Sequence, residues 1–446
     1  MKKKNLFIAI MTMVVSLLGA VTAFAADAPK LDTGDTTFII MSTAFVFLMT
    51  PGLAFFYGGM VRQKNVLNTM MTSFVAIALI SIQWILFGYS IAFGPDQAGV
   101  IGSFDWIGLS NVTTAVNADY AATIPHQLFM MYQMMFAIIT VALISGAFAE
   151  RMKFGAVVAF TLLWSTLVYD PLAHWVWGVG GWLRTMGALD FAGGNVVHIS
   201  SGVAGLVVAL VIGKRKGYGH ASMLPHNIPF VLLGAALLWF GWFGFNAGSA
   251  LGSSELAINA FVTTNTAAAA ATLSWILLEW LRHGKPTIIG AATGAVVGLV
   301  AITPGAGFVT PLASIIIGLA VSPICYFAIS YLKPKLGYDD ALDAFGCHGI
   351  GGIWGGIATG LFATKAVNSA GADGLFYGNP NQLVIQLISI VVTIAFSAIV
   401  SFIILKVIGL FTKLRVSEEE ENLGLDYASH GENAYRELDN QQGMSV

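Results

Sequence analysis

The sequence consists largely of apolar runs of roughly 20 residues, separated by short polar loops. A helix of that length spans the hydrocarbon core of a bilayer, because each residue adds about 1.5 Å to a core of about 30 Å. Hydrophobic residues make up 57% of the chain and charged residues only 10%, against roughly a quarter charged in soluble domains. The pattern predicts an all-α polytopic membrane protein, whose backbone polar groups are satisfied within helices.

The first 25 residues have the form of a cleavable signal peptide. Three lysines at 2–4 precede an apolar stretch from Leu6 to Val21, and Ala23 to Ala25 reads small-x-small. We predict removal of residues 1–25, with an uncleaved extra helix as the alternative. The transmembrane domain then covers 26–411, and a polar tail with four consecutive acids from Glu418 covers 412–446. Composition favours a solvated tail over a docking element.

Eleven apolar runs follow the signal peptide. The last run is the longest, which predicts a helix that is tilted or that overhangs the bilayer. The predicted spans are about 36–58, 70–93, 125–149, 154–178, 194–213, 227–250, 256–281, 287–303, 308–331, 343–363 and 382–411.

The distribution of basic residues predicts the orientation. Fifteen lysines and arginines fall in alternate loops and the tail, whereas the other side of the mature chain carries only Lys30, Arg184 and Lys365. Because basic loops stay in the cytoplasm, we expect the N-terminus outside and the C-terminus inside. The expected location is the inner cell membrane.

Two histidines in apolar runs share one context. His198 follows Asp190 by eight residues, and His348 follows Asp340 by the same spacing. One pair begins the fifth span and the other the tenth, so the chain reads as a 5+5 inverted repeat plus a long final helix. Each histidine then lies about 12 Å deep from opposite faces, and adjacency of the two is a hypothesis. The alternative is two unrelated core histidines. Both aspartates are interpreted first as helix caps.

Aromatic residues occupy two helix faces. Tyr132 and Phe136 are four residues apart, as are Phe245 and Ser249, and Trp177 ends the fourth span. Ordinary packing or an interfacial belt explains them in isolation. A hydroxyl beside aromatic faces can also hold a small cation, and a deeper phenylalanine pair can exclude hydrated ions. Asp170 and His174, four residues apart in the fourth span, are expected to bond each other.

These residues lie in motifs that resemble the ammonium transporter (Amt/Mep/Rh) family. The motifs run from Asp190 to His198, Gly241 to Ser249, Tyr169 to Trp177, Phe345 to His348 and Gly424 to Gly431, and the resemblance covers about 36–437. The resemblance implies eleven helices, a homotrimer with one pore per subunit, and regulation by a cytoplasmic PII-type signal protein.

The same resemblance implies a role for each site residue. Trp177 and Ser249 would line an outer ammonium site with Tyr132 beside it, although that position is often Phe in the family. Phe136 and Phe245 would form a gate, and Asp190 would hold the outer region in shape. The pore would be lined or supported by His198, His348, Trp242 and Thr303.

We therefore expect a transporter that binds NH4+, deprotonates it and conducts NH3, with or without an accompanying proton. The alternatives are an ammonium sensor that signals through a PII-type partner, and a channel for neutral CO2. An enzyme is disfavoured, because no nucleophile–base set, metal cluster or phosphate loop is evident, and no cofactor is expected. Cys325 and Cys347 are interpreted as small hydrophobic residues.

Overall fold

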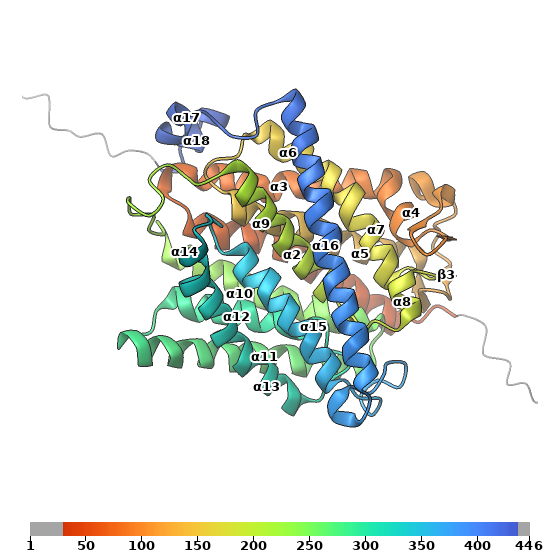
Figure 1. Ribbon diagram of the computed structural model, residues 1–446. Helices are drawn as coiled ribbons and strands as arrows, with labels where there is room; N and C mark the ends of the chain where they lie inside the picture. The colour runs from red at the N-terminus through yellow and green to blue at the C-terminus, as the bar shows by residue number, and fades with distance from the viewer. Residues whose placement is uncertain (1–29, 436–446) are drawn as a thin grey trace, which may run out of the picture.

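The computed structural model describes residues 30–435, which form a bundle of long helices (Figure 1). The predicted signal peptide at 1–25 lies outside the described residues. Nine helical segments within 30–435 are long and apolar enough to cross a membrane, and Ile288–Ile302 is a shorter apolar helix. These ten helices and the helical segment 345–362 together cover the eleven apolar runs that the sequence predicts. The all-α membrane architecture is confirmed, whereas the number of crossings and the orientation stay predictions.

Several helices are continuous through π-helical turns, which often mark functional positions. The long helices and the segments joined to them are α2 (Thr33–Met60), α3–η2–α4 (Val66–Gln83, Trp84–Gly88, Tyr89–Phe93), α5 (His126–Phe148), α6–η4–α7 (Phe154–Trp164, Ser165–Tyr169, Asp170–Trp177), η5–α9 (Gly194–Ile199, Ser200–Ile212), α10–η6 (Ile228–Ala247, Gly248–Ala250), α11 (Glu255–His283), α12 (Ile288–Ile302), α13–η7–α14 (Pro311–Phe327, Ala328–Leu332, Lys333–Leu336), η8–α15 (Phe345–Gly349, Ile350–Phe362) and α16 (Pro380–Phe411).

Short elements lie at the two ends of the bundle. Two antiparallel strand pairs and α8 lie at one end of the bundle. The helices α17 and α18 lie at the opposite end, which we call the tail end (Figure 1). The short elements are η1 (Gln63–Asn65), β1 (Asp96–Gln97), β2 (Ile101–Gly102), η3 (Phe104–Leu109), β3 (Val116–Asn117), β4 (Ala121–Pro125), α8 (Trp182–Met186), η9 (Leu375–Tyr377), α17 (Glu418–Leu423) and α18 (Leu425–His430).

Glycines bring the two histidine-bearing segments into contact. A Cβ added at Gly202 of α9 would lie 2.2 Å from the backbone nitrogen of Gly349 in η8. One added at Gly352 of α15 would lie 3.1 Å from the Cβ of His198. Small residues let helix backbones approach closely in membranes. The glycine content of these two segments therefore explains why His198 and His348 lie on neighbouring backbones.

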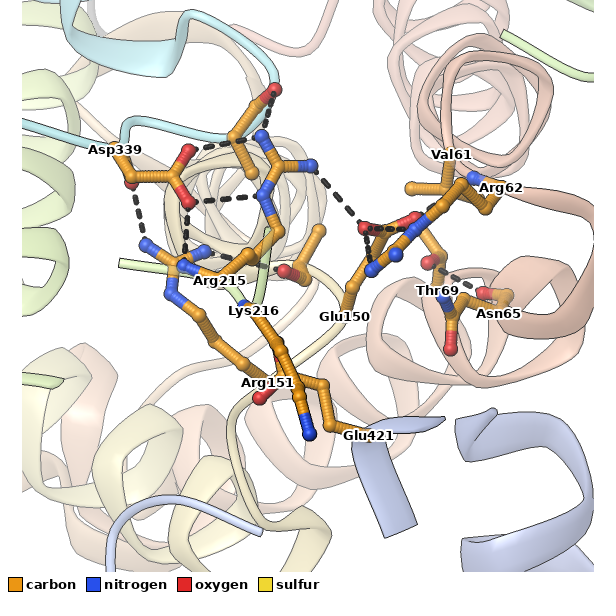
Figure 2. A network of polar contacts seen from close by, with 12 residues as sticks. Val61, Arg62, Asn65, Thr69, Glu150, Arg151, Arg215, Lys216, Asp339 and Glu421 are labelled. Atoms are coloured by element: carbon orange, nitrogen blue, oxygen red, sulfur yellow. Dashed lines mark hydrogen bonds and ion pairs between the residues drawn. The ribbon is translucent and has the colours of Figure 1, made fainter. Parts of the chain in front are cut away.

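An ionic network joins four loops at the tail end (Figure 2). Arg215 donates to both carboxylate oxygens of Asp339, at 2.8 and 3.0 Å, and to Glu150 Oε2 at 3.2 Å. Arg62 donates to the same Glu150 oxygen at 2.9 Å. Burial acts to raise the pKa of the Glu150 and Asp339 carboxyls, but the arginine bonds and charges outweigh it, so both pKa values lie below their usual range.

We expect Glu150→Ala to destabilise the folded protein by roughly 3–5 kcal/mol, because it removes the only carboxylate bonded to Arg62 within residues 30–435 and leaves Arg215 with Asp339 alone. The measurement is the thermal unfolding midpoint in detergent, followed by tryptophan fluorescence. Glu418→Ala is the matched control, since Glu418 pairs with Lys216 at the surface and exposed pairs contribute about 1 kcal/mol or less. Equal shifts for the two variants would contradict a structural role for the network.

The tail is docked onto the bundle through residues 415–430. The buried Glu421 carboxylate accepts from Arg415 at 2.6 Å and from the Lys216 backbone nitrogen at 2.5 Å. Asp426 accepts from the backbone nitrogen of Asn68 at 2.8 Å, near the start of α3. The expectation of a solvated tail is therefore wrong for this stretch. Composition could not show it, because two of the acids are buried against partners far away in the sequence.

Candidate functional site

A cavity of about 190 Å³ opens at the end of the bundle opposite the tail end. Its walls come from the loop before β4, from α5, from the end of α7 and from α8, η6 and the loop before η5. Most of the wall is aromatic. The lining residues are Phe93, Asp119, Tyr120, Phe129, Gln133, Phe136, Val176, Trp177, Arg184, Phe191, Ser249 and Leu251.

Trp177 and Ser249 both line this cavity, whereas Tyr132 lies behind its wall. We call it the outer cavity, after the orientation that the basic residues predict. The Trp177 indole donates to the Asp190 carbonyl at 2.9 Å, which fixes the ring. The fully buried Tyr132 hydroxyl lies 3.2 Å from Ser249 Oγ and 2.9 Å from the carbonyls of Gly244 and Phe245. Tyr132 therefore holds Ser249 in place, a contact that Phe at this position could not make.

Phe136 and Phe245 close the inner end of the outer cavity. Their ring centroids lie 4.2 Å apart with an interplanar angle of 31°, and both side chains are buried. Trp177 meets Phe136 edge-on, with centroids 5.9 Å apart. Any solute that moves inward from Trp177 must displace or pass between these two rings.

The two histidines lie directly below this pair. Their Nδ1 atoms are 3.3 Å apart, so one ring donates to the other, and the rings are stacked with centroids at 5.3 Å. Both side chains are buried, and His198 Nε2 has no hydrogen-bond partner within residues 30–435. An unsatisfied nitrogen at this depth is costly, so the site is built to offer a polar atom to something that passes.

A second, enclosed cavity surrounds the histidines. Its volume of about 10 Å³ is at the lower limit for a single water molecule. Apart from the imidazoles, the Trp242 indole and the Met49 thioether, its walls are hydrocarbon or phenyl groups, including Phe245. The outer cavity, the phenylalanine pair and the enclosed cavity lie in a row of contacting rings, which we call the path.

Trp242 and Thr303 form one unit. The Trp242 ring stacks on His198, with centroids 5.3 Å apart, and its indole nitrogen donates to Thr303 Oγ1 at 2.9 Å. Thr303 donates in turn to the Leu299 carbonyl at 2.8 Å. Trp242 therefore lines the path, and Thr303 orients it from behind.

Asp190 and Asp340 are helix caps. Asp190 accepts backbone N–H bonds from Gly193, Gly194 and Asn195 at 2.6–2.7 Å, and a longer one from Val196 at 3.4 Å. Asp340 accepts from Ala344 at 3.0 Å and from Phe345 at 2.8 Å. The two caps start the segments that carry His198 and His348, so the matched spacing in sequence corresponds to matched local structure.

Asp170 and His174 do not bond each other. Asp170 accepts from Gln83 Nε2 at 2.6 Å, whereas His174 binds Asp96 at 2.9 Å and lies 3.0 Å from the Ala92 carbonyl. The four-residue spacing places both side chains on one helix face, but each side chain bonds a residue of a neighbouring element instead.

Several lining residues were missed by the sequence reasoning, among them Gln133, Asp119 and Arg184. Gln133 follows Tyr132, and its Oε1 is buried with no hydrogen-bond partner within the described chain. Asp119 and Arg184 come from loops, where no periodicity marks a function. Over residues 30–435, no group of three or more histidine, cysteine or acidic side chains is placed to hold a metal ion.

This fold and site define a multi-pass membrane protein in which an aromatic cavity, a phenylalanine pair and two buried imidazoles lie in a row. The chain belongs to the Ammonium Transporter Family, whose family model matches residues 37–435.

Two curated relatives and one solved structure show the extent of the similarity. An ammonium transporter of Bacillus subtilis is 61% identical over 404 residues, covering 91% of this chain and 99% of the relative. Ammonium transporter Amt1 of Archaeoglobus fulgidus is 49% identical and covers 90% and 99%. The crystal structure of Saccharomyces cerevisiae Mep2 superposes with a TM-score of 0.84 at 37% identity, covering 92% and 93%. The relatives are named transporters, which does not favour the sensor alternative.

Proposed function

We propose that the protein takes up ammonium in three steps. NH4+ binds in the outer cavity between Trp177 and Ser249, loses a proton at the Phe136–Phe245 pair, and continues as NH3 past His198 and His348. The observation that carries this proposal is the unbroken row of contacting rings from Trp177 through Phe136 and Phe245 to the two imidazoles.

The energetics of ion transfer support deprotonation at the phenylalanine pair. A bare ion in an apolar medium costs tens of kcal/mol by Born estimates, whereas neutral NH3 avoids most of that cost. In the outer cavity, aromatic faces stabilise a cation by about 0.5–2 kcal/mol, and the Ser249 hydroxyl and Gln133 Oε1 offer acceptors. Below the pair, each imidazole can donate at one nitrogen and accept at the other, which provides a route for the released proton.

We further propose the assembly and setting that the family resemblance implies. The protein acts as a homotrimer in the inner cell membrane, with residues 1–25 removed, the transmembrane domain at 26–411 and the tail at 412–446. The outer cavity faces outside and the tail end faces the cytoplasm, in keeping with the bias of basic residues. A PII-type regulatory protein docks on the cytoplasmic face.

Proteoliposomes that receive a step of ammonium at constant pH test the proposed transport. We expect a protein-dependent inward current with ammonium and none with an equal step of K+, together with a change in lumenal pH well below that caused by free NH3 entry. Alkalinisation without current would contradict the proton route while retaining NH3 conduction. Absence of both signals beyond those of protein-free vesicles would contradict transport itself.

A further inference from the structure

Arg184 is an unexpected residue at the mouth of a cation site. It is one of three basic residues that the loop pattern assigns to the outer side, and it lines the outer cavity. Among the lining residues, Arg184 is the only basic side chain and Asp119 the only acidic one. Within the described residues, Arg184 has no carboxylate within ion-pair distance. Its charge is therefore not neutralised by a direct partner.

The guanidinium is fixed beside Trp177. Arg184 Nη1 donates to the Trp177 carbonyl at 2.6 Å. That carbonyl belongs to the last residue of α7, where helix carbonyls lack partners within the helix and favour a nearby cation. Gly180 and Gly187 flank α8 with φ values of +92° and +93°, backbone conformations that glycine adopts without strain. They fold the loop back so that Arg184 reaches α7.

Arg184 and Asp119 act on the same part of the cavity wall. The Tyr120 hydroxyl donates to the Phe93 carbonyl at 2.7 Å and accepts from the Val179 nitrogen at 3.2 Å. Burial raises the pKa of Tyr120 to about 12, while the charge of Arg184 acts to lower it and that of Asp119 to raise it further. Arg184, Asp119 and Tyr120 all line the same cavity.

We propose that Arg184 sets the apparent affinity of the outer cavity for ammonium. Its fixed positive charge lowers the concentration of cations at the mouth, and Asp119 opposes it. The charge acts on entry and on initial binding, before the phenylalanine pair, so it changes KM and leaves the maximal rate nearly constant. This inference rests on the proposed uptake of NH4+.

The size of the effect follows from Coulomb's law. A unit charge about 10 Å away changes the occupancy of a monovalent cation about twofold in bulk water, and about tenfold where low-dielectric walls focus the field. Salt screens an exposed charge over a Debye length of about 8 Å at physiological ionic strength. If the change in KM depends on ionic strength, it comes from the charge of Arg184 and not from its bond to the Trp177 carbonyl.

The test compares Arg184→Gln, which keeps a donor and loses the charge, with Arg184→Lys, which keeps the charge. Ammonium currents in proteoliposomes are measured at about 10 mM and about 300 mM of an impermeant salt, conditions that differ severalfold in Debye length. Lys365→Gln is the matched control, because Lys365 is an exposed basic residue of the same side outside the cavity lining.

We expect Arg184→Gln to lower KM about two- to tenfold at low salt, with a smaller change at high salt. Arg184→Lys should lower it less, and Lys365→Gln should leave it unchanged. Asp119→Asn should raise KM, and the Arg184→Gln/Asp119→Asn double variant should return it toward the original value. A salt-independent loss of maximal rate, equal in both Arg184 variants, would overturn the proposal in favour of a purely structural bond. If the unmodified protein gave no ammonium current, the proposed function itself would fail; a normal current with an unchanged KM in Arg184→Gln refutes this inference alone.

Discussion

Replacing His198 and His348 together with leucine should abolish charge-coupled ammonium transport in a protein that still folds. The two rings are the polar groups of the enclosed cavity below the phenylalanine pair, apart from the Trp242 indole that is bonded to Thr303. Without them, a proton released at the pair meets only hydrocarbon and aromatic surface. Proton transfer by a positioned side chain contributes about 10²–10⁴-fold to a rate, so we expect a current reduced by at least about 10²-fold.

The folded state should tolerate this double replacement better than either single one. Replacing both partners of a buried hydrogen bond with apolar groups of similar shape is close to neutral, whereas removing one leaves the other unsatisfied. Each single variant leaves an Nδ1 that was 3.3 Å from its partner without one. Each single variant should therefore unfold at a lower temperature than the double variant.

Ammonium current in proteoliposomes and the unfolding midpoint in detergent are the two measurements for these variants. His220→Leu, at an exposed position away from the path, controls for the loss of any histidine. A selective, electrogenic ammonium current of normal size in the double variant would remove the histidines from the mechanism.

The sequence predicted those features that depend on local patterns. Hydropathy located the helices, because a spanning helix must be apolar along its whole length. The equal spacing of Asp190 to His198 and Asp340 to His348 indicated two equivalent helix starts, and the structure places the histidines side by side. The adjacency itself depends on Gly202 and Gly352, whose role is apparent only when the two backbones are seen together.

Features that depend on distant partners could not be predicted. Arg215, Asp339, Glu150 and Arg62 come from four different loops, and no spacing relates them. The tail acids have the composition of a solvated surface, yet Glu421 and Asp426 are buried and bond the backbone nitrogens of Lys216 and Asn68, more than 200 residues away. Asp170 and His174 were paired by helical spacing, which says nothing of the neighbours Gln83 and Asp96.

Asp190→Ala should cause the largest loss of stability of any single change near the site. Its carboxylate accepts four backbone N–H bonds at the start of η5, and alanine leaves those buried donors without a partner. Each orphaned donor costs about 1–3 kcal/mol. The total of several kcal/mol is comparable with the whole stability of a typical folded domain, about 5–15 kcal/mol.

The same change should remove transport, because both parts of the site depend on this turn. The Asp190 carbonyl accepts from the Trp177 indole at 2.9 Å, and the turn places His198 against His348. We expect a low yield of folded protein in detergent, and no ammonium current from any that is recovered. Asp190→Asn retains one acceptor oxygen and should fall between the original protein and Asp190→Ala, which keeps the prediction measurable if the alanine variant does not fold.

Asp340→Ala is the internal comparison for this prediction. Asp340 caps the equivalent turn in the second half of the chain but accepts only two backbone N–H bonds within the described structure. If the number of orphaned donors determines the cost, Asp340→Ala should lower the unfolding midpoint about half as much as Asp190→Ala. Equal losses would show that the number of orphaned donors does not determine the cost. A stable and active Asp190→Ala would show that the buried donors find other partners at little cost.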